Sequence, residues 1–291
     1  PGGLKVQTIH AFCTRLLHQF AFEAGTGAGF DVLDEPTRNE MLERLTLEVM
    51  LEGAAEPKKP LGRALEKAIR SAADQTFKDM VSEAVKRRDE ITEWVARTGS
   101  VEAAIGELDH ALGLAAGDSE ETIVRQCREG LSDSEWQRLS DLFASGDRND
   151  RYQVGRLKRM IEAGWPNALD DYLGIFLRSE NGEPKKDHYL MGRELRKENA
   201  QIWQQLCDER ERLSAGRCWT RLKSVRARDR TGALLTVAHE VIDRYRKAKA
   251  RRGLLDYDDL IDRTLDLFGR TSAAWVLYKL DQGIDHILLD E

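Results

Sequence analysis

The stretch GLLDYDDLI, residues 253–261, marks where one helix is predicted to end and another to begin. Apolar residues recur with helical spacing before it, which predicts a helix over about residues 231–251 that Gly253 ends. A second helix is predicted to follow, as far as about Leu267. Acids at positions 256, 258 and 259 suit its N-terminus, because the helix dipole favours negative charge there. Three acids in four residues can also hold Mg²⁺ or Ca²⁺, but the dipole is a sufficient explanation.

Composition narrows the class of protein. The chain has 291 residues, of which 33% are charged and 41% hydrophobic, with a net charge of −6. This balance is typical of a soluble helical protein of one large or two smaller domains. No apolar run approaches the roughly 18 residues of a membrane span, and no signal-peptide core precedes the first helix. The cysteines lack a C-x-x-C pair, which argues against zinc and favours a reducing cytoplasm; they are Cys13, Cys127, Cys207 and Cys218.

The N-terminal third predicts a strand followed by helices. Residues 5–9 favour a short strand, and a helix with one apolar stripe follows from His10 to Phe20. Glycines at 25, 27 and 29 follow a helix and lack a Gly-Lys-Ser/Thr, so they predict a helix stop and not a phosphate loop. Residues 30–33 are predicted to be extended. Helices then fill the middle of the chain: one from Pro36, short ones to about residue 180, and long ones over 187–214 and 231–251.

One segment is strongly basic. Residues 217–252 hold twelve Lys and Arg against three acids. Such a segment can contact DNA phosphates, and Trp219 within it can stack on a base, although a solvated helix face has the same composition. The other tryptophans are expected in the core. The candidate DNA-binding cations lie at the end of the segment: Arg244, Arg246, Lys247, Lys249, Arg251 and Arg252.

The last residues resemble the Mg²⁺-binding strand of a phosphate-loop NTPase. A buried strand is predicted over 284–289, and Asp290-Glu291 follows it. A plain strand that ends in an acidic turn has the same pattern. The phosphate loop G-x-x-x-x-G-K-[ST] does not occur in the sequence, so we expect a piece of a larger motor with no ATP hydrolysis of its own.

Three motifs in a fixed order resemble those of one family. Thr8-Ile9-His10-Ala11-Phe12 is similar to the T-x-H motif of UvrD/RecB-like superfamily 1A DNA helicases, and Asp256-Tyr257-Asp258-Asp259-Leu260 is similar to their D-[FY]-D-D-L motif. Residues 30–35 resemble the entry into the inserted subdomain. The large helical insert and the wording of residues 253–261 are most similar to AddA-type helicase–nuclease subunits of AddAB recombination complexes.

The resemblance implies a fold class and a division into domains. It implies a mainly α chain, in which a helical inserted subdomain (1B-like) at 31–252 is flanked by pieces of a RecA-like α/β motor subdomain at 1–30 and 253–291. In the parent, Asp290 is expected to hold Mg²⁺ and Glu291 to be the catalytic residue that polarises the attacking water. Thr8 and His10 are expected to face single-stranded DNA, because a helix N-terminus can meet a phosphate.

The implied partners are DNA, both single-stranded and duplex near a junction, and a second subunit of an AddAB-type complex. ATP and Mg²⁺ are the implied cofactors of the parent, with neither expected on this chain, and the implied role is repair of double-strand breaks. From the residues alone, Thr8 is equally a plain helix cap and His10 a local packing residue. A stand-alone helical DNA-binding module and a helical protein-interaction scaffold therefore remain as alternatives.

Overall fold

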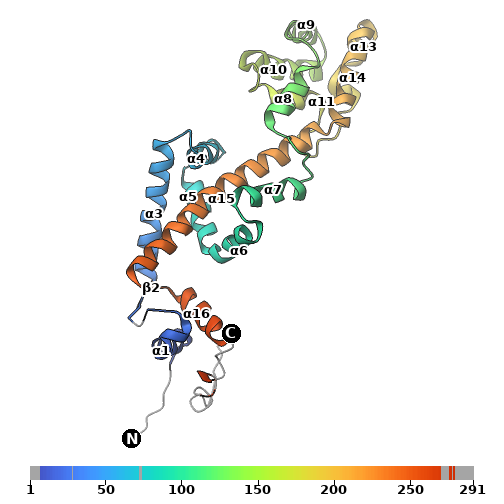
Figure 1. Ribbon diagram of the computed structural model, residues 1–291. Coiled ribbons are helices and arrows are strands. Elements are labelled where there is room, and N and C mark those ends of the chain that lie inside the picture. The colour runs from blue at the N-terminus through green and yellow to red at the C-terminus, as the bar shows by residue number, and fades with distance from the viewer. Residues whose placement is uncertain (1–6, 28, 72–73, 270–274, 277, 279–291) are drawn as a thin grey trace. The chain divides into compact units, whose positions relative to one another are not determined.

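The computed structural model describes residues 7–27, 29–71, 74–269, 275, 276 and 278, and this part of the chain is mainly α-helical, as predicted (Figure 1). The elements are α1 Ile9–Gln19, α2 Ala21–Ala24, β1 Asp31–Val32, α3 Glu35–Ala55, α4 Pro60–Ser71, α5 Asp74–Lys86, α6 Arg88–Thr98, α7 Val101–Ala111, α8 Glu120–Arg128, α9 Asp133–Ala144, α10 Arg148–Ala163, α11 Leu169–Phe176, α12 Asp187–Leu190, α13 Arg193–Glu198, α14 Ala200–Ala215, α15 Cys218–Arg252, β2 Leu254–Leu255 and α16 Tyr257–Gly269.

The chain forms two compact units. Unit 1 consists of residues 1–91 and 235–291, and unit 2 consists of residues 92–234. The division falls inside α6 and α15. The boundaries of the inserted subdomain predicted from the sequence, at residues 31 and 252, both lie within unit 1.

Unit 1 begins with helices whose ends have local causes. The apolar stripe of α1 is buried as predicted, with Leu17 fully inaccessible, and Gly25 ends α2 in the left-handed conformation at φ 63°. Asp34 caps α3 by accepting a hydrogen bond from the Thr37 amide at 3.0 Å. The predicted extended stretch is β1, which pairs in parallel with β2 in a two-stranded sheet. This sheet joins the end of α15 to the start of α3.

Among the described residues, two apolar clusters show how helices of unit 1 pack together. One packs α1 and α2 against α16 through residues that include Leu16, Leu17 and Leu260. The other packs the start of α3 against Tyr245 of α15. The second cluster explains why α3 lies beside the C-terminal part of α15 in Figure 1.

Unit 2 is a helical domain around one large core. Trp136, Tyr172 and Phe176 are at most 1% exposed and their rings contact one another. Ser119 and Ser132 cap α8 and α9, each as part of a capping box. Of the tryptophans expected in the core, Trp136 is confirmed, whereas Trp275 of unit 1 is 52% exposed and that expectation is wrong.

Two helix predictions were wrong in extent. The helix predicted over 187–214 is three helices, with breaks near Gly192 and at Asn199. At the first break, the Gly192 amide donates to Asp150 Oδ1 at 2.7 Å. A Cβ at Gly192 would lie 2.4 Å from Asp150 Oδ2, so only glycine fits this close approach. The helix predicted over 231–251 begins earlier, at Cys218.

Some predictions concern residues outside the described ranges. The strand at 284–289 and the carboxylates of Asp290 and Glu291 are among them. The sequence also predicts a helix over 273–280, and most of that range lies outside the described residues as well. Of the strand predicted over residues 5–9, the described part is irregular at Gln7 and Thr8 and helical at Ile9. None of the helices in the described part of the chain is long and apolar enough to cross a membrane.

Candidate nucleic-acid interface

The N-terminus of α1 is open to solvent. Thr8 is its N-cap, with an extended backbone and a hydroxyl that accepts a hydrogen bond from the Ala11 amide at 3.3 Å. Gln7, Thr8 and Ile9 are exposed, and the first turn holds no acid. The positive end of this helix dipole therefore has no negative side chain within its own first turn, which leaves it suited to an anion such as a phosphate.

His10 connects this helix end to the D-Y-D-D motif. Its ring centroid lies 4.6 Å from that of Tyr257, with the ring planes tilted by 35°. His10 and Tyr257 are both partly exposed and stand in the first turns of α1 and α16. Segments at opposite ends of the sequence thus place two helix N-termini and two polar aromatic rings together.

The two helix ends differ in charge. Asp256 caps α16 by accepting from the Asp259 amide at 3.0 Å, while Asp259 accepts in return from the Asp256 amide at 2.9 Å. Asp258 also stands in the first turn of α16. Because these carboxylates offset the dipole of α16, α1 is the helix end that favours an anion.

Beneath this surface, Asp256 forms the centre of a buried ion cluster. It is 0% exposed and accepts hydrogen bonds from Arg88 Nη2 at 3.1 Å, Lys249 Nζ at 2.9 Å and the Tyr245 hydroxyl at 2.7 Å. Arg88 also pairs with Asp258, and Lys249 with Asp259. The cluster joins α6, α15 and α16, so the acids of the motif act as an internal brace.

The pKa shifts match this arrangement. Burial opposes ionisation of Asp256, but Lys249, the Asp259 amide and the Tyr245 hydroxyl outweigh it and hold the pKa of Asp256 well below its usual range. Burial and the Asp256 carboxylate raise the pKa of Tyr245. Arg88 is buried, yet Asp256 and Asp258 raise its pKa. All three groups keep their ordinary charge states at neutral pH, which suits a structural role.

The cations at the end of α15, which the sequence predicts to contact DNA, differ in burial and in ion pairing. Lys249 is only 5% exposed and belongs to the ion cluster, which removes it from the residues we propose for DNA contact. Arg244 pairs with Glu52 and Glu240, and Lys247 with Asp243. Arg246 is exposed and lies 3.8 Å from Asp89. Arg251 and Arg252 are exposed and have no ion pair among the described residues.

The earlier half of the basic segment lies in unit 2, and three of its six cations, Arg221, Arg226 and Arg228, are neutralised by ion pairs. Arg226 pairs with Glu120 and Asp170 at 2.6 and 2.7 Å, and Arg228 pairs with Asp109 at 3.0 Å. These acids lie far away in the sequence, so a count along the chain could not find them.

Trp219 packs against the core of unit 2, with the Lys223 ammonium 5.2 Å from its ring centroid. The turn at Gly182 covers part of the ring, since a Cβ there would lie 3.0 Å from Trp219 Cδ1. These contacts leave less of the ring open for stacking on a base.

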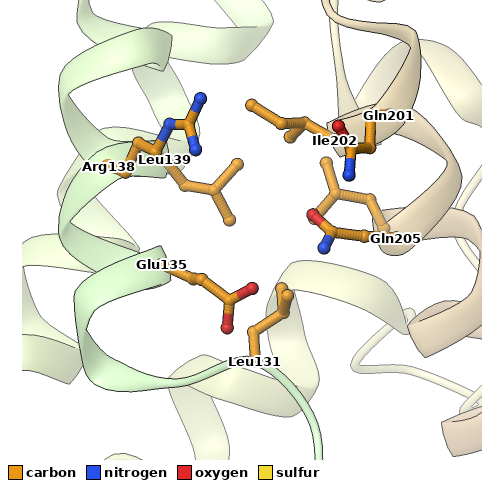
Figure 2. Close-up of a pocket in the computed structure, with 8 residues that line it drawn as sticks. Leu131, Glu135, Arg138, Leu139, Gln201, Ile202 and Gln205 are labelled. Atoms are coloured by element: carbon orange, nitrogen blue, oxygen red, sulfur yellow. The ribbon is translucent and has the colours of Figure 1, made fainter.

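Figure 2 shows a small cavity between α9 and α14 of unit 2, which is not a cleft of nucleotide size. Leucine and isoleucine side chains line it, with Glu135, Arg138 and two glutamines at its edge. Its volume is about 100 Å³. This volume is well below the roughly 300–1,000 Å³ that is typical of sites for small-molecule ligands.

Sequence reasoning missed Arg88 altogether. It stands next to Arg87, and nothing in its neighbourhood distinguishes the buried arginine from the exposed one. The meeting of His10 with Tyr257 was also not foreseen as a contact, although both motifs were found.

A mainly helical domain in which T-x-H and D-Y-D-D motifs meet is of the class found in DNA motors. The profile of the family described as UvrD/REP helicase N-terminal domain matches residues 2–291. The chain therefore belongs to this family, whose members are ATP-dependent DNA helicases that use ATP and Mg²⁺. No curated protein sequence matches the chain significantly.

Proposed function

We propose that this chain contacts and guides DNA within an ATP-dependent helicase of the AddA type, which unwinds broken DNA ends for recombination. On this proposal, residues 31–252 are the inserted subdomain and the two ends belong to the RecA-like motor. Asp290 would hold Mg²⁺ and Glu291 would polarise the attacking water in the parent. A second, AddB-type subunit would complete the assembly.

The observation that supports DNA contact best is the convergence of α1, His10 and Tyr257. An exposed helix end without acids attracts a phosphate, and the Thr8 hydroxyl lies at that end. His10 and Tyr257 add an imidazole and a phenol, groups that donate hydrogen bonds to phosphate or stack on a base. Together these groups suit single-stranded DNA, in which backbone and unpaired bases are both accessible.

Nearby cations support the same surface. Arg252 stands five positions before Tyr257 in the chain, so their Cα atoms lie within about 18 Å of each other. Arg251 and Arg252 are exposed and unpaired among the described residues, and Arg246 keeps about half of its side chain exposed, at 46%. Such cations add affinity that is independent of sequence and falls with salt.

The test is fluorescence anisotropy with a labelled oligothymidylate at low salt. The 291-residue chain should bind, and His10→Ala should weaken binding about fivefold or more, the lower limit for loss of one stacking partner. His18→Ala is the matched control, because His18 lies at the other end of α1 and stacks on Phe30. Equal affinity of the His10 and His18 variants would refute the proposed surface.

A second measurement tests whether the chain alone hydrolyses ATP. Because the sequence has no phosphate loop, the chain alone should show no DNA-stimulated ATP hydrolysis. Turnover that persists through repurification would contradict the assignment of these residues to part of a motor.

A further inference from the structure

A second surface with the properties of a DNA contact lies in unit 2, on α10. This helix carries Arg148, Arg151, Tyr152, Gly155 and Lys158 on one stripe, because residues three and four apart share a helix face. All five are exposed, and Tyr152 is 69% exposed. The opposite face holds the buried residues Asp150, Gln153, Leu157 and Met160. The stripe is therefore the solvent-exposed face of a helix whose opposite face packs in the core of unit 2.

The cations of this stripe are available. Arg148, Arg151 and Lys158 have no ion pair among the described residues, in contrast to Arg226 and Arg228 of α15. Arg159 also faces this side but is held by Asp171 at 2.6 Å. Acids stand at both ends of the stripe, Asp147 as the N-cap of α10 before Arg148 and Glu162 in the last turn. Over ten residues at 1.5 Å each, the three available cations span about 15 Å, a length that two or three phosphates can follow.

Exposed aromatic rings accompany the cations. Tyr189 of α12 is 51% exposed, and its ring lies 4.1 Å from that of His188. Gln153 Nε2 donates to Tyr189 O at 2.7 Å, and Asn149 Nδ2 donates to His188 O at 3.2 Å. These bonds hold the backbone of α12 beside the first half of α10. Tyr152 of α10 and Tyr189 of α12 are thus both large aromatic residues with more than half of their surface exposed.

Gly155 leaves a gap in the middle of the stripe. A Cβ at this position would meet only Arg159 Nη1, at 3.8 Å. Packing therefore does not require glycine here, and glycine within a helix costs stability relative to alanine. A gap flanked by Arg151 and Lys158 lets a sugar–phosphate backbone approach the helix closely.

We propose that the surface formed by Arg148, Arg151, Tyr152, Gly155, Lys158 and Tyr189 binds single-stranded DNA. Cations arranged along a line with exposed aromatic rings are the combination that binds a charged backbone and unpaired bases together. Duplex DNA would use the cations but leave the rings without bases to stack on. The inference rests on the proposed function, since it assumes that the chain binds DNA, but it concerns a surface separate from α1.

The experiment measures how affinity for a labelled oligothymidylate depends on salt. The variant R148A/R151A/K158A removes three phosphate contacts, each of which contributes about 0.7 to the slope of log K against log salt for single strands. The slope should become shallower by about 2. The control R125A/R128A/R138A removes three exposed cations that are likewise unpaired among the described residues, from α8 and α9, and should leave the slope unchanged.

Two further variants separate charge from stacking and from folding. Tyr152→Ala should weaken single-strand binding about fivefold or more without changing the slope. R148K/R151K/K158R keeps the charges and should keep the slope. Circular dichroism should show wild-type melting for all variants, because every altered residue is exposed.

The results that would overturn the inference are distinct from failure of the proposed function. Equal slopes for the α10 variant and its control, with binding retained and sensitive to His10→Ala, would refute the α10 surface alone. If R148A/R151A/K158A loses affinity only for duplex DNA, measured with an unlabelled duplex as competitor, single-stranded DNA is refuted as the ligand of this surface. Absence of any DNA binding by the unaltered chain would refute both proposals.

Discussion

Replacing Asp256 with alanine should destabilise unit 1 selectively. The change removes the one fully buried carboxylate of the ion cluster. The cations of Arg88 and Lys249, each only 5% exposed, then keep only the more exposed carboxylates as partners. Asp258 and Asp259 still face them, with side chains 49% and 28% exposed. The Tyr245 hydroxyl and the Asp259 amide lose their acceptor as well.

The expected cost follows from these losses. Removing one partner of a buried ion pair costs about 3–5 kcal/mol, and a buried polar group without a partner costs about 1–3 kcal/mol. The remaining acids share the two cations, so we expect about 3–4 kcal/mol in total for Asp256→Ala. Asp256→Asn should cost less, because its amide oxygen can still accept from Tyr245.

Hydrogen exchange measures the cost locally. At 1.36 kcal/mol per factor of ten, a loss of about 3 kcal/mol accelerates exchange roughly 150-fold. This acceleration should appear in amides of α16 and the C-terminal turns of α15. Amides in the unit 2 core, around Trp136, should exchange as in the unaltered protein. An acceleration below about fivefold in α16, or an equal change in both units, would refute the bracing role of Asp256.

Asp262 on the same helix provides the matched control. Partial burial and the neighbouring carboxylates of Asp89, Asp259 and Asp258 raise its pKa. Its ionised form therefore opposes folding, and Asp262→Asn should leave stability unchanged or slightly raised. The pH dependence has opposite signs at the two sites. Stabilisation by Asp256 is present above pH 3.8 and is lost as pH falls further, whereas the unfavourable contribution of Asp262 appears as pH rises above 3.8.

Three further outcomes are expected. Gly253→Ala should destabilise unit 1 by about 1 kcal/mol, because φ at this position is +65°; chemical denaturation would measure it, and an unchanged midpoint would contradict it. Burial and Arg156 lower the pKa of Lys185 to about 8, whereas its value in the unfolded chain is 10.5. The stability of unit 2 should therefore rise as pH increases from 8 towards 10.5, because only the unfolded chain keeps the proton there. Urea titrations should show that Lys185→Met abolishes this rise. A hydrogen bond with Cys127 lowers the pKa of Cys218 to about 7, yet Cys218 is only 3% exposed. Iodoacetamide should therefore modify the more accessible Cys207 first, as measured by mass spectrometry of the peptides. Faster modification of Cys218 would contradict its burial.

Features with local causes could be predicted from the sequence. The cap of α3 at Asp34, the capping boxes at Ser119 and Ser132 and the helix stops at Gly25 and Gly253 all depend on residues within one helical turn. The break at Gly192 could not be predicted, because its cause is a hydrogen bond to Asp150, 42 residues earlier. Periodicity across residues 187–214 suggested one helix, and only the fold shows where it must bend.

The basic segment shows the same limit for charge. Counting along residues 217–252 gave a strong excess of cations, but Arg226 and Arg228 find their acids on α7, α8 and α11. Meanwhile α10 has five cations against the two acids Asp150 and Glu162, and its cations Arg148, Arg151 and Lys158 are exposed without an ion pair among the described residues. Net charge per segment measures composition, whereas a polyanion responds to the charge that remains unpaired on a surface.

The D-Y-D-D motif combines two roles that its sequence does not separate. Asp256 is the cap of α16 and points into the interior, where it meets Arg88 and Lys249. Tyr257, one residue later, lies on the opposite side and meets His10 at the surface. A helix start makes this division necessary, because consecutive residues there face different directions. The ion cluster consequently fixes the position of Tyr257, and a change at Asp256 should disturb the proposed DNA surface without touching it.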